Sequence, residues 1–249
     1  MKSSVLNGQL AAQFAGEGFA VVHNFYSPAE VAALLQAVTS APGNGPNFRR
    51  SQEVFAIRDL LGKVPALWPL LDTAALRTVL KQLFPNDYHL VKAIYFDKPA
   101  GSNWLVAWHQ NLMINVKQQT DSPGFGSWTN KAEGVSVQPP MAVLENMCTI
   151  RIHLDDCDAT NGALKVVPGS HQRGVMPAAN IASLTPAATS CAVPAGGAML
   201  MKPLLLHASN RSTSEQPRRV MHLEFAFVEL PAGLVWRERP AQLAATRAK

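Results

Sequence analysis

The C-terminal two thirds of the chain contain a succession of short apolar runs that restrict the fold more than any other feature. Gly, Pro, Asn and Asp residues separate these runs, and such residues favour turns. Short strands broken by frequent turns are typical of antiparallel sandwiches and barrels, whereas helical bundles need longer periodic segments. The predicted strands cover residues 88–96, 105–116, 148–154, 163–167, 198–201, 204–208 and 218–228.

The N-terminal part of the chain favours helices instead. Its capping box, Ser27-Pro28-Ala29-Glu30, places proline in the first turn of a helix. We therefore predict an α+β chain that is mainly β, in one domain over residues 1–249, with a helical part at about 1–87 and strands at about 88–230. The expected N-terminal elements are a helix marked by Leu6, Leu10 and Phe14, a strand over 19–22, the helix after Ser27, a polar loop over 41–52 and a helical segment over 65–84.

Composition excludes several classes of protein. Of the 249 residues, 47% are hydrophobic, which is too many for a disordered chain. We find no apolar run of about 18 residues and no signal peptide, so neither a membrane span nor secretion is expected. The formal charge is +5, but no basic run exceeds two or three residues, so nucleic acid is not an expected partner. The cysteines, Cys148, Cys157 and Cys191, lack metal or disulfide spacing, which favours a cytoplasmic location.

Two histidines in predicted strands are candidates for a metal site. His109 and Asn111 lie two residues apart, and the period of a strand puts both side chains on one face. A distant His207 on another strand completes three donors, in the layout of the 2-His-1-carboxylate triad that binds Fe(II). The carboxylate of that triad is absent, because position 111 is Asn.

A second set of donors competes with the first. His153 and Asp155 form a His-x-Asp pair on another predicted strand, and His207 follows 54 residues after His153. A cupin-like metal protein that uses these three residues stays open, because a bare His-x-Asp pair is a weak signal and spacing does not choose between the two sets.

Two adjacent arginines follow the distal histidine at the start of an apolar strand. Arg218 lies eleven residues after His207 and precedes Arg219. An arginine can hold a carboxylate through two parallel hydrogen bonds. Since strand side chains alternate, we expect only one of the pair to point into the protein.

The order of several motifs resembles that of the phytanoyl-CoA dioxygenase family, whose members are Fe(II)- and 2-oxoglutarate-dependent oxygenases. The resemblance covers nearly the whole chain and is most specific from Asn161 to His171. It implies a double-stranded β-helix, the jelly-roll or cupin-like barrel, with N-terminal helices packed outside. The motifs are Trp108-His109-Gln110-Asn111, residues 151–156, Asn161-Gly162-Ala163-Leu164, Pro168-Gly169-Ser170-His171, His207 and Arg218.

The resemblance also implies roles for individual residues. It places the metal at His109, Asn111 and His207, and leaves His153 and Asp155 on a later strand. Arg218 is then expected to hold the distal carboxylate of the cosubstrate 2-oxoglutarate, with help from Ser209, and Arg151 to contact the same pocket. The segment 117–140 is expected to be a loop that covers the site and shapes substrate choice. Trp128 and Lys131 are candidate contacts there, while packing within an exposed loop is the favoured alternative for both.

Asn111 leaves the activity of this sequence open, since an amide offers a neutral oxygen where the family has an anionic one. One interpretation is an oxygenase that binds iron weakly and hydroxylates a small organic substrate with O₂. Another is a position vacated as in related halogenases. A third is a catalytically impaired relative, natural or engineered, that acts as a small-molecule-binding protein.

Overall fold

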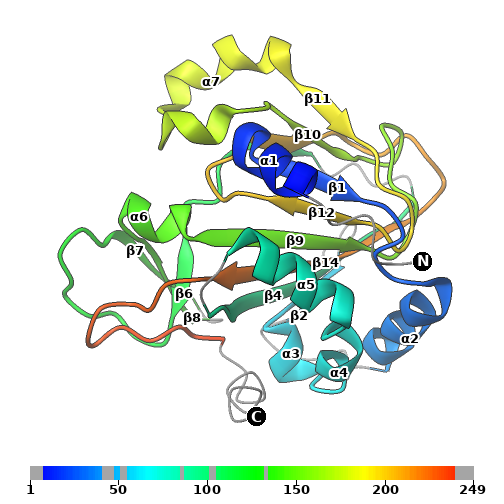
Figure 1. Cartoon of the computed structure of the whole chain (residues 1–249), viewed down its shortest axis with the longest axis horizontal. Helices are drawn as coiled ribbons and strands as arrows, with labels where there is room; N and C mark the ends of the chain where they lie inside the picture. The colour runs from blue at the N-terminus through cyan, green and yellow to red at the C-terminus, as the bar shows by residue number, and fades with distance from the viewer. Residues whose placement is uncertain are drawn as a thin grey trace.

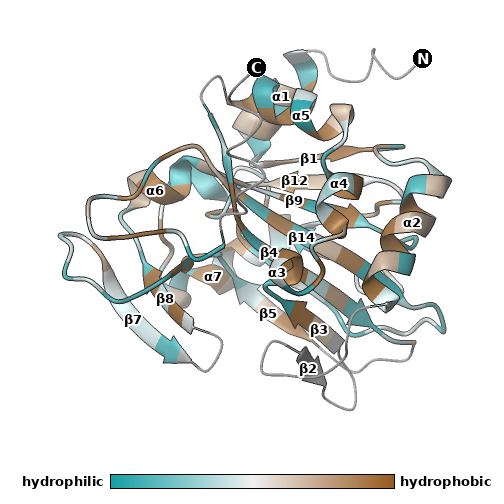
Figure 2. Ribbon diagram, turned by 90° about the horizontal axis from the view of Figure 1, so that it is seen from below, coloured by the Kyte–Doolittle hydropathy of each residue, from teal (hydrophilic) through white to brown (hydrophobic). Residues whose placement is uncertain are grey.

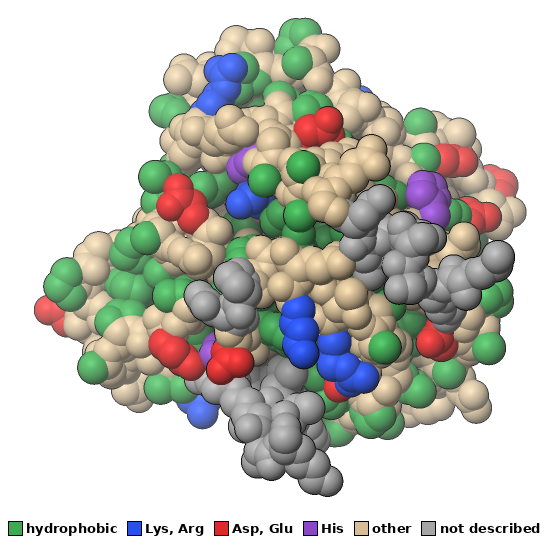
Figure 3. Space-filling view, in the orientation of Figure 1, with side chains coloured by type: hydrophobic (Ala, Val, Ile, Leu, Met, Phe, Trp, Pro, Cys, Tyr) green, Lys and Arg blue, Asp and Glu red, His purple; other side chains and the backbone are tan. Residues whose placement is uncertain are grey.

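The computed structural model of the protein describes residues 8–40, 48–50, 55–84, 87–100, 105–131 and 134–238. Within these ranges no helix combines the length and the apolar character needed to cross a membrane. Lys and Arg side chains lie scattered among acidic and uncharged ones over the face drawn in Figure 3.

A seven-stranded antiparallel sheet forms the centre of the molecule (Figure 1). Its two longest strands, β4 (His89–Lys98) and β14 (Arg218–Ala226), pair along their whole length, with Arg218 opposite Lys98 at one end and Ala226 opposite His89 at the other. Three strands from the predicted helical part join this sheet, so both parts of the chain build one layer. In spatial order the strands are β1 (Phe19–Val22), β12 (Ala198–Met201), β9 (Met147–His153), β14 (Arg218–Ala226), β4 (His89–Lys98), β3 (Phe55–Arg58) and β2 (Phe48–Arg50).

Helices cover one face of this sheet (Figures 1 and 2). The predicted capping box starts the second of them, since the Ser27 hydroxyl accepts a hydrogen bond from the Glu30 amide and the Glu30 carboxylate accepts one from the Ser27 amide. Apolar side chains of the helices and of alternate strand positions share one buried core. The helices are α1 (Gly8–Glu17), α2 (Pro28–Thr39), α3 (Leu60–Lys63), α4 (Leu67–Leu71) and α5 (Ala74–Leu83).

A second antiparallel sheet lies against the other face of the large sheet. Its strands are β11 (Thr189–Cys191), β10 (Leu164–Val166), β13 (His207–Ser209) and β5 (Val106–His109), in that order. Apolar residues of both sheets form a shared core, among them Val166 and Met199. Two facing antiparallel sheets with helices outside confirm the predicted α+β, mainly β class and give the jelly-roll arrangement.

The remaining elements lie at the ends of the two sheets. Three strands, β6 (Ile114–Val116), β8 (Gly134–Gln138) and β7 (Gly126–Lys131), form a small sheet that packs around Trp236. The short helices are α6 (Met141–Glu145), α7 (Ala178–Leu184), η1 (Ser170–Arg173) and η2 (Thr185–Ala187).

The small sheet corrects the prediction that residues 117–140 form a loop over the site. β7 and β8 pair as a hairpin, and Val137 on β8 is fully buried beside Trp236. The alternation of Val135 and Val137 was the overlooked sequence signal. Trp128 packs against this core and does not line the pocket that is described in the next section. The side chain of Lys131 is not among those that the structure describes.

Other element boundaries differ for local reasons. The predicted run 105–116 divides into β5 and β6, because the chain turns away from the sheet at Gln110 and Asn111, where the Asn111 amide donates to the Pro203 carbonyl. The helical segment 65–84 divides where the Thr73 hydroxyl caps α5. β2 lies inside the predicted polar loop 41–52, and the rest of that loop falls largely outside the described residues. Leu6 of the predicted first helix also falls outside them.

Glu238 provides a pH-dependent contribution to stability. Burial raises the pKa of its carboxyl to about 7, and the carboxyl accepts a hydrogen bond from the Ala93 amide at 2.8 Å. An unfolded chain loses this proton near pH 4.5, so folding stability falls as pH rises from about 4.5 to about 7. Gln keeps the acceptor without the charge. We expect Glu238→Gln to raise the free energy of unfolding at pH 8 by about 1–3 kcal/mol.

Chemical denaturation at pH 4 and pH 8 checks this expectation. At pH 4 the variant and the parent should unfold alike, because Glu238 is protonated in both states. The exposed Glu215→Gln is the control and should show no pH-dependent gain. An equal gain for Glu238→Gln at both pH values would contradict the assignment.

Candidate active site

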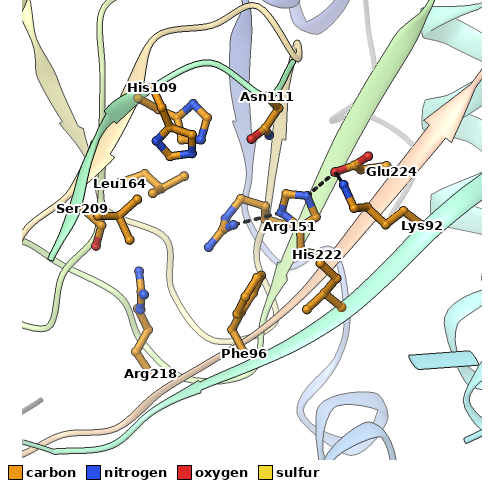
Figure 4. Close-up of a pocket in the computed structure, with 13 residues that line it drawn as sticks. Lys92, Phe96, His109, Asn111, Arg151, Leu164, Ser209, Arg218, His222 and Glu224 are labelled. Carbon is orange, nitrogen blue, oxygen red and sulfur yellow. Dashed lines mark hydrogen bonds and ion pairs between the residues drawn. The ribbon is translucent and has the colours of Figure 1, made fainter. Parts of the chain in front are cut away.

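One pocket opens between the two large sheets (Figure 4). Its volume of about 220 Å³ is below the range of roughly 300–1,000 Å³ that drug-sized ligands need, so it suits small molecules. All six residues predicted for the site line it, among thirteen in total. The lining residues are Lys92, Ile94, Phe96, Val106, His109, Asn111, Arg151, Leu164, His207, Ser209, Arg218, His222 and Glu224.

His109 and His207 face each other across two paired strands. They are cross-strand partners of β5 and β13, and their ring centroids lie 4.2 Å apart. Each Nδ1–H donates to a backbone carbonyl two residues earlier, Ala107 and Leu205, at 2.8 Å. This bond fixes the tautomer and leaves each Nε2 lone pair free to bind a metal. Burial, and then His109, lower the pKa of His207 to about 3, so the imidazole stays neutral.

Asn111 lies beside the imidazole pair, from which Figure 4 shows its amide to be separated by open space. The side-chain Nδ2 is buried and has no hydrogen-bond partner. Among the described residues, no three His, Cys, Asp or Glu side chains gather in a group that could hold a metal ion. The donors at this point are therefore two imidazole nitrogens and one amide group. These donor types fit a divalent transition metal, but together they carry no negative charge.

Arg218 and Ser209 lie on the side of the pocket away from Asn111 (Figure 4). The Arg218 Nη1 and the Ser209 hydroxyl both donate to the Gly162 carbonyl, the hydroxyl at 2.7 Å. Arg218 is buried, and its Nε has no partner. Gly162 has a φ of +84°, and a Cβ there would lie 2.7 Å from the Lys98 amine, so the Asn-Gly turn needs glycine to approach this closely.

The neighbouring Arg219 points away from the pocket, as the alternation along β14 requires. Its guanidinium binds the Asp155 carboxylate with two hydrogen bonds of 2.8 and 2.6 Å. His153 is buried among other groups and does not line the pocket. The structure therefore does not assemble the competing set of His153, Asp155 and His207.

A buried polar network was missed by the sequence analysis. Arg151 Nη1 donates to His222 Nδ1 at 3.0 Å, and His222 Nε2 donates to Glu224 Oε1 at 3.0 Å. The Lys92 amine reaches the same carboxylate oxygen at 3.0 Å. Although burial opposes ionisation, Lys92 and His222 lower the pKa of Glu224 to about 2. Positions 218, 222 and 224 alternate along β14, and this period-two pattern was the available signal.

Comparison with known proteins agrees with the fold. The family model "Phytanoyl-CoA dioxygenase (PhyH)" matches residues 14–220, whereas no curated protein matches the chain in sequence. EctD from S. alaskensis, solved with 2-oxoglutarate and 5-hydroxyectoine, is 21% identical over 98% of this chain and 85% of its own, with a TM-score of 0.71. HygX from Streptomyces hygroscopicus, solved with nickel, 2-oxoglutarate and hygromycin B, is 15% identical over 89% of this chain and 87% of its own, with a TM-score of 0.65.

A third similar structure is SnoK, a non-heme alpha ketoglutarate dependent carbocyclase from nogalamycin biosynthesis. It is 15% identical over 98% of this chain and 91% of its own, with a TM-score of 0.64. At these identities the likeness concerns the fold, while the family match spans most of the chain and confirms the resemblance seen in the motifs. The chain belongs to the phytanoyl-CoA dioxygenase family.

Proposed function

We propose that the protein is an Fe(II)- and 2-oxoglutarate-dependent oxygenase that hydroxylates a small organic substrate. One observation carries the proposal: two imidazoles with free Nε2 atoms and a buried arginine with a free Nε open into the same small pocket. Family membership supports it, as do the metal and 2-oxoglutarate named for EctD and HygX.

The proposed ligands of the metal are His109, His207 and Asn111. When bound, iron and 2-oxoglutarate supply the oxidising chemistry that activates O₂ and hydroxylates a C–H bond. The protein's part is to hold the ligands in place, because the backbone carbonyls of Ala107 and Leu205 fix the two imidazoles before any metal arrives.

Arg218 is proposed to orient the cosubstrate. Its Nη1 is fixed on the Gly162 carbonyl and its guanidinium also contacts the Cys157 side chain, whereas its buried Nε has no partner and is proposed to donate to the distal carboxylate of 2-oxoglutarate. Ser209 stands beside it, held by the same carbonyl. The apolar side chains of Ile94, Val106 and Leu164 line the pocket between these polar groups.

A second candidate function is a small-molecule-binding protein without turnover. The neutral donor set around Asn111 favours it, because a site without a carboxylate holds a divalent cation less tightly. In this case Arg218 and Ser209 still provide a site for 2-oxoglutarate.

Two measurements on the purified protein separate the candidates. Fe(II) is titrated under anaerobic conditions, and succinate release from 2-oxoglutarate is then followed in air at saturating Fe(II). We expect weak iron binding and succinate release that depends on both iron and 2-oxoglutarate. Binding of 2-oxoglutarate with neither iron uptake nor succinate would reject the oxygenase and support the binding protein.

A further inference from the structure

A second arginine lines the pocket beside Arg218. Arg151 lies on β9 and is only 7% exposed. It lines the same cavity as Arg218, and its Nε is buried and has no hydrogen-bond partner. Figure 4 shows its guanidinium extending into the open centre of the pocket. Buried polar groups normally have partners, so an unused donor that points into a cavity indicates a ligand.

The charges around the pocket are not balanced by the protein. The lining carries three cationic side chains, Lys92, Arg151 and Arg218, and one carboxylate, Glu224. Lys92 and Glu224 lie 3.0 Å apart and neutralise each other. Two guanidinium charges therefore remain, and Asn111 adds no negative charge. Burying such charges is costly unless anions pair with them, so the pocket is built for two anionic groups.

Arg151 and Arg218 lie on neighbouring strands of the large sheet, and each is held through its Nη1, Arg218 by the Gly162 carbonyl and Arg151 by His222. His222 donates from Nε2 to Glu224, so its Nδ1 lone pair accepts the Nη1–H of Arg151. Lys92 keeps the Glu224 carboxylate in place. The edge of Arg151 formed by Nε and Nη2 is left over, and this edge binds a carboxylate through two parallel hydrogen bonds.

The supports of the two arginines are far apart along the strands. Arg151 is the cross-strand partner of His222, which is four residues beyond Arg218 on β14, or about 13 Å of strand. Arg218 is fixed beside Gly162 and Ser209, whereas Arg151 is fixed within the network of His222 and Glu224. Burial, and then the nearby charge of Arg218, lower the pKa of Arg151, so the two guanidinium groups interact across the pocket. It is their separate supports, and not the distance between the charges, that favour two separate carboxylates.

We propose that Arg151 binds a carboxylate of the substrate, so that the pocket takes a small carboxylic acid together with 2-oxoglutarate. The identity of the second anion as the substrate rests on the proposed function, but the anion site itself does not. His222, Glu224 and Lys92 are positioning residues that hold the guanidinium.

Butyrate and its neutral analogue butyramide are suitable probes for this site. Their binding is measured by ligand-observed NMR on the protein saturated with 2-oxoglutarate and Mn(II), and 2-oxoglutarate binding is measured by calorimetry. We expect butyrate to bind without displacing 2-oxoglutarate, and butyramide to bind at least about tenfold more weakly.

Three variants locate the two anions. Arg151→Gln should weaken butyrate at least about tenfold and change 2-oxoglutarate binding less than about threefold, and Arg218→Gln should do the reverse. Arg219→Gln is the matched control and should change neither. If Arg151→Gln does not fold, Arg151→Lys keeps a charge without the two parallel bonds and should also weaken butyrate.

The remaining outcomes are distinguishable. Equal binding of butyrate and butyramide would overturn the anion site. Loss of 2-oxoglutarate binding in Arg151→Gln to the same extent as in Arg218→Gln, or displacement of 2-oxoglutarate by butyrate, would show that both arginines hold one dianion and would also overturn it. Butyrate binding that depends on Arg151 in a protein that does not bind 2-oxoglutarate would support the site and reject the proposed function.

Discussion

The Asn111→Asp variant is expected to bind Fe(II) at least about a hundredfold more tightly than the parent protein. The carboxylate adds an anionic oxygen to two neutral imidazoles whose Nε2 atoms are already free. The substitution preserves the shape of the side chain, and the Asn111 Nδ2 that it replaces has no hydrogen-bond partner to lose. Succinate release at limiting iron should rise with the affinity.

Anaerobic Fe(II) titration and 2-oxoglutarate consumption measure the two effects side by side. Asp155→Asn is the control, because it removes a carboxylate of the competing donor set, and it should leave iron binding unchanged. If Asn111→Asp alters neither metal content nor 2-oxoglutarate consumption, the metal site is wrongly assigned. A loss of iron in Asp155→Asn would point to the competing set instead.

The Arg218→Gln variant is expected to raise the dissociation constant for 2-oxoglutarate by about a hundredfold to ten-thousandfold. Two hydrogen bonds between charged groups are lost in a buried site, and each contributes about 1.5–3 kcal/mol. Arg219→Gln is a matched control, since the adjacent arginine binds Asp155 outside the pocket and should leave 2-oxoglutarate binding nearly unchanged.

Calorimetry in the presence of Mn(II) gives the dissociation constant for 2-oxoglutarate of each of the two variants. Circular dichroism shows whether the Arg218→Gln protein is folded, which matters because Arg218 also bonds to the Gly162 carbonyl. Similar affinities for the folded Arg218→Gln and Arg219→Gln proteins would contradict the assignment of Arg218 to the distal carboxylate.

Much of the fold could be predicted because its signals are local. The strand of residues 19–22 follows from a short apolar run and the helix after Ser27 from a capping box, and both signals involve neighbours in sequence. Alternation also showed that only one of Arg218 and Arg219 points inward, and the structure separates them in this way.

The choice between the two donor sets could not be made from spacing. Whether His207 meets His109 or His153 depends on which strands pair, and β13 pairs with β5 across almost a hundred residues. The resemblance to the family supplied that information. The network of Lys92 and Glu224 was missed for the same reason, because its members are 132 residues apart in sequence and share only a sheet face.

Each of the two imidazoles is held by a backbone carbonyl two residues earlier in the chain. The orientation of the rings therefore does not depend on whether a metal is bound. In small zinc domains the folding energy comes from the metal, whereas here Ala107 and Leu205 supply the orientation without it. A change at Asn111, the proposed third ligand, is therefore expected to act on metal affinity and reactivity alone. Such a scaffold can lose or regain its metal through a single side chain at position 111 while the β-sheets around it keep their register.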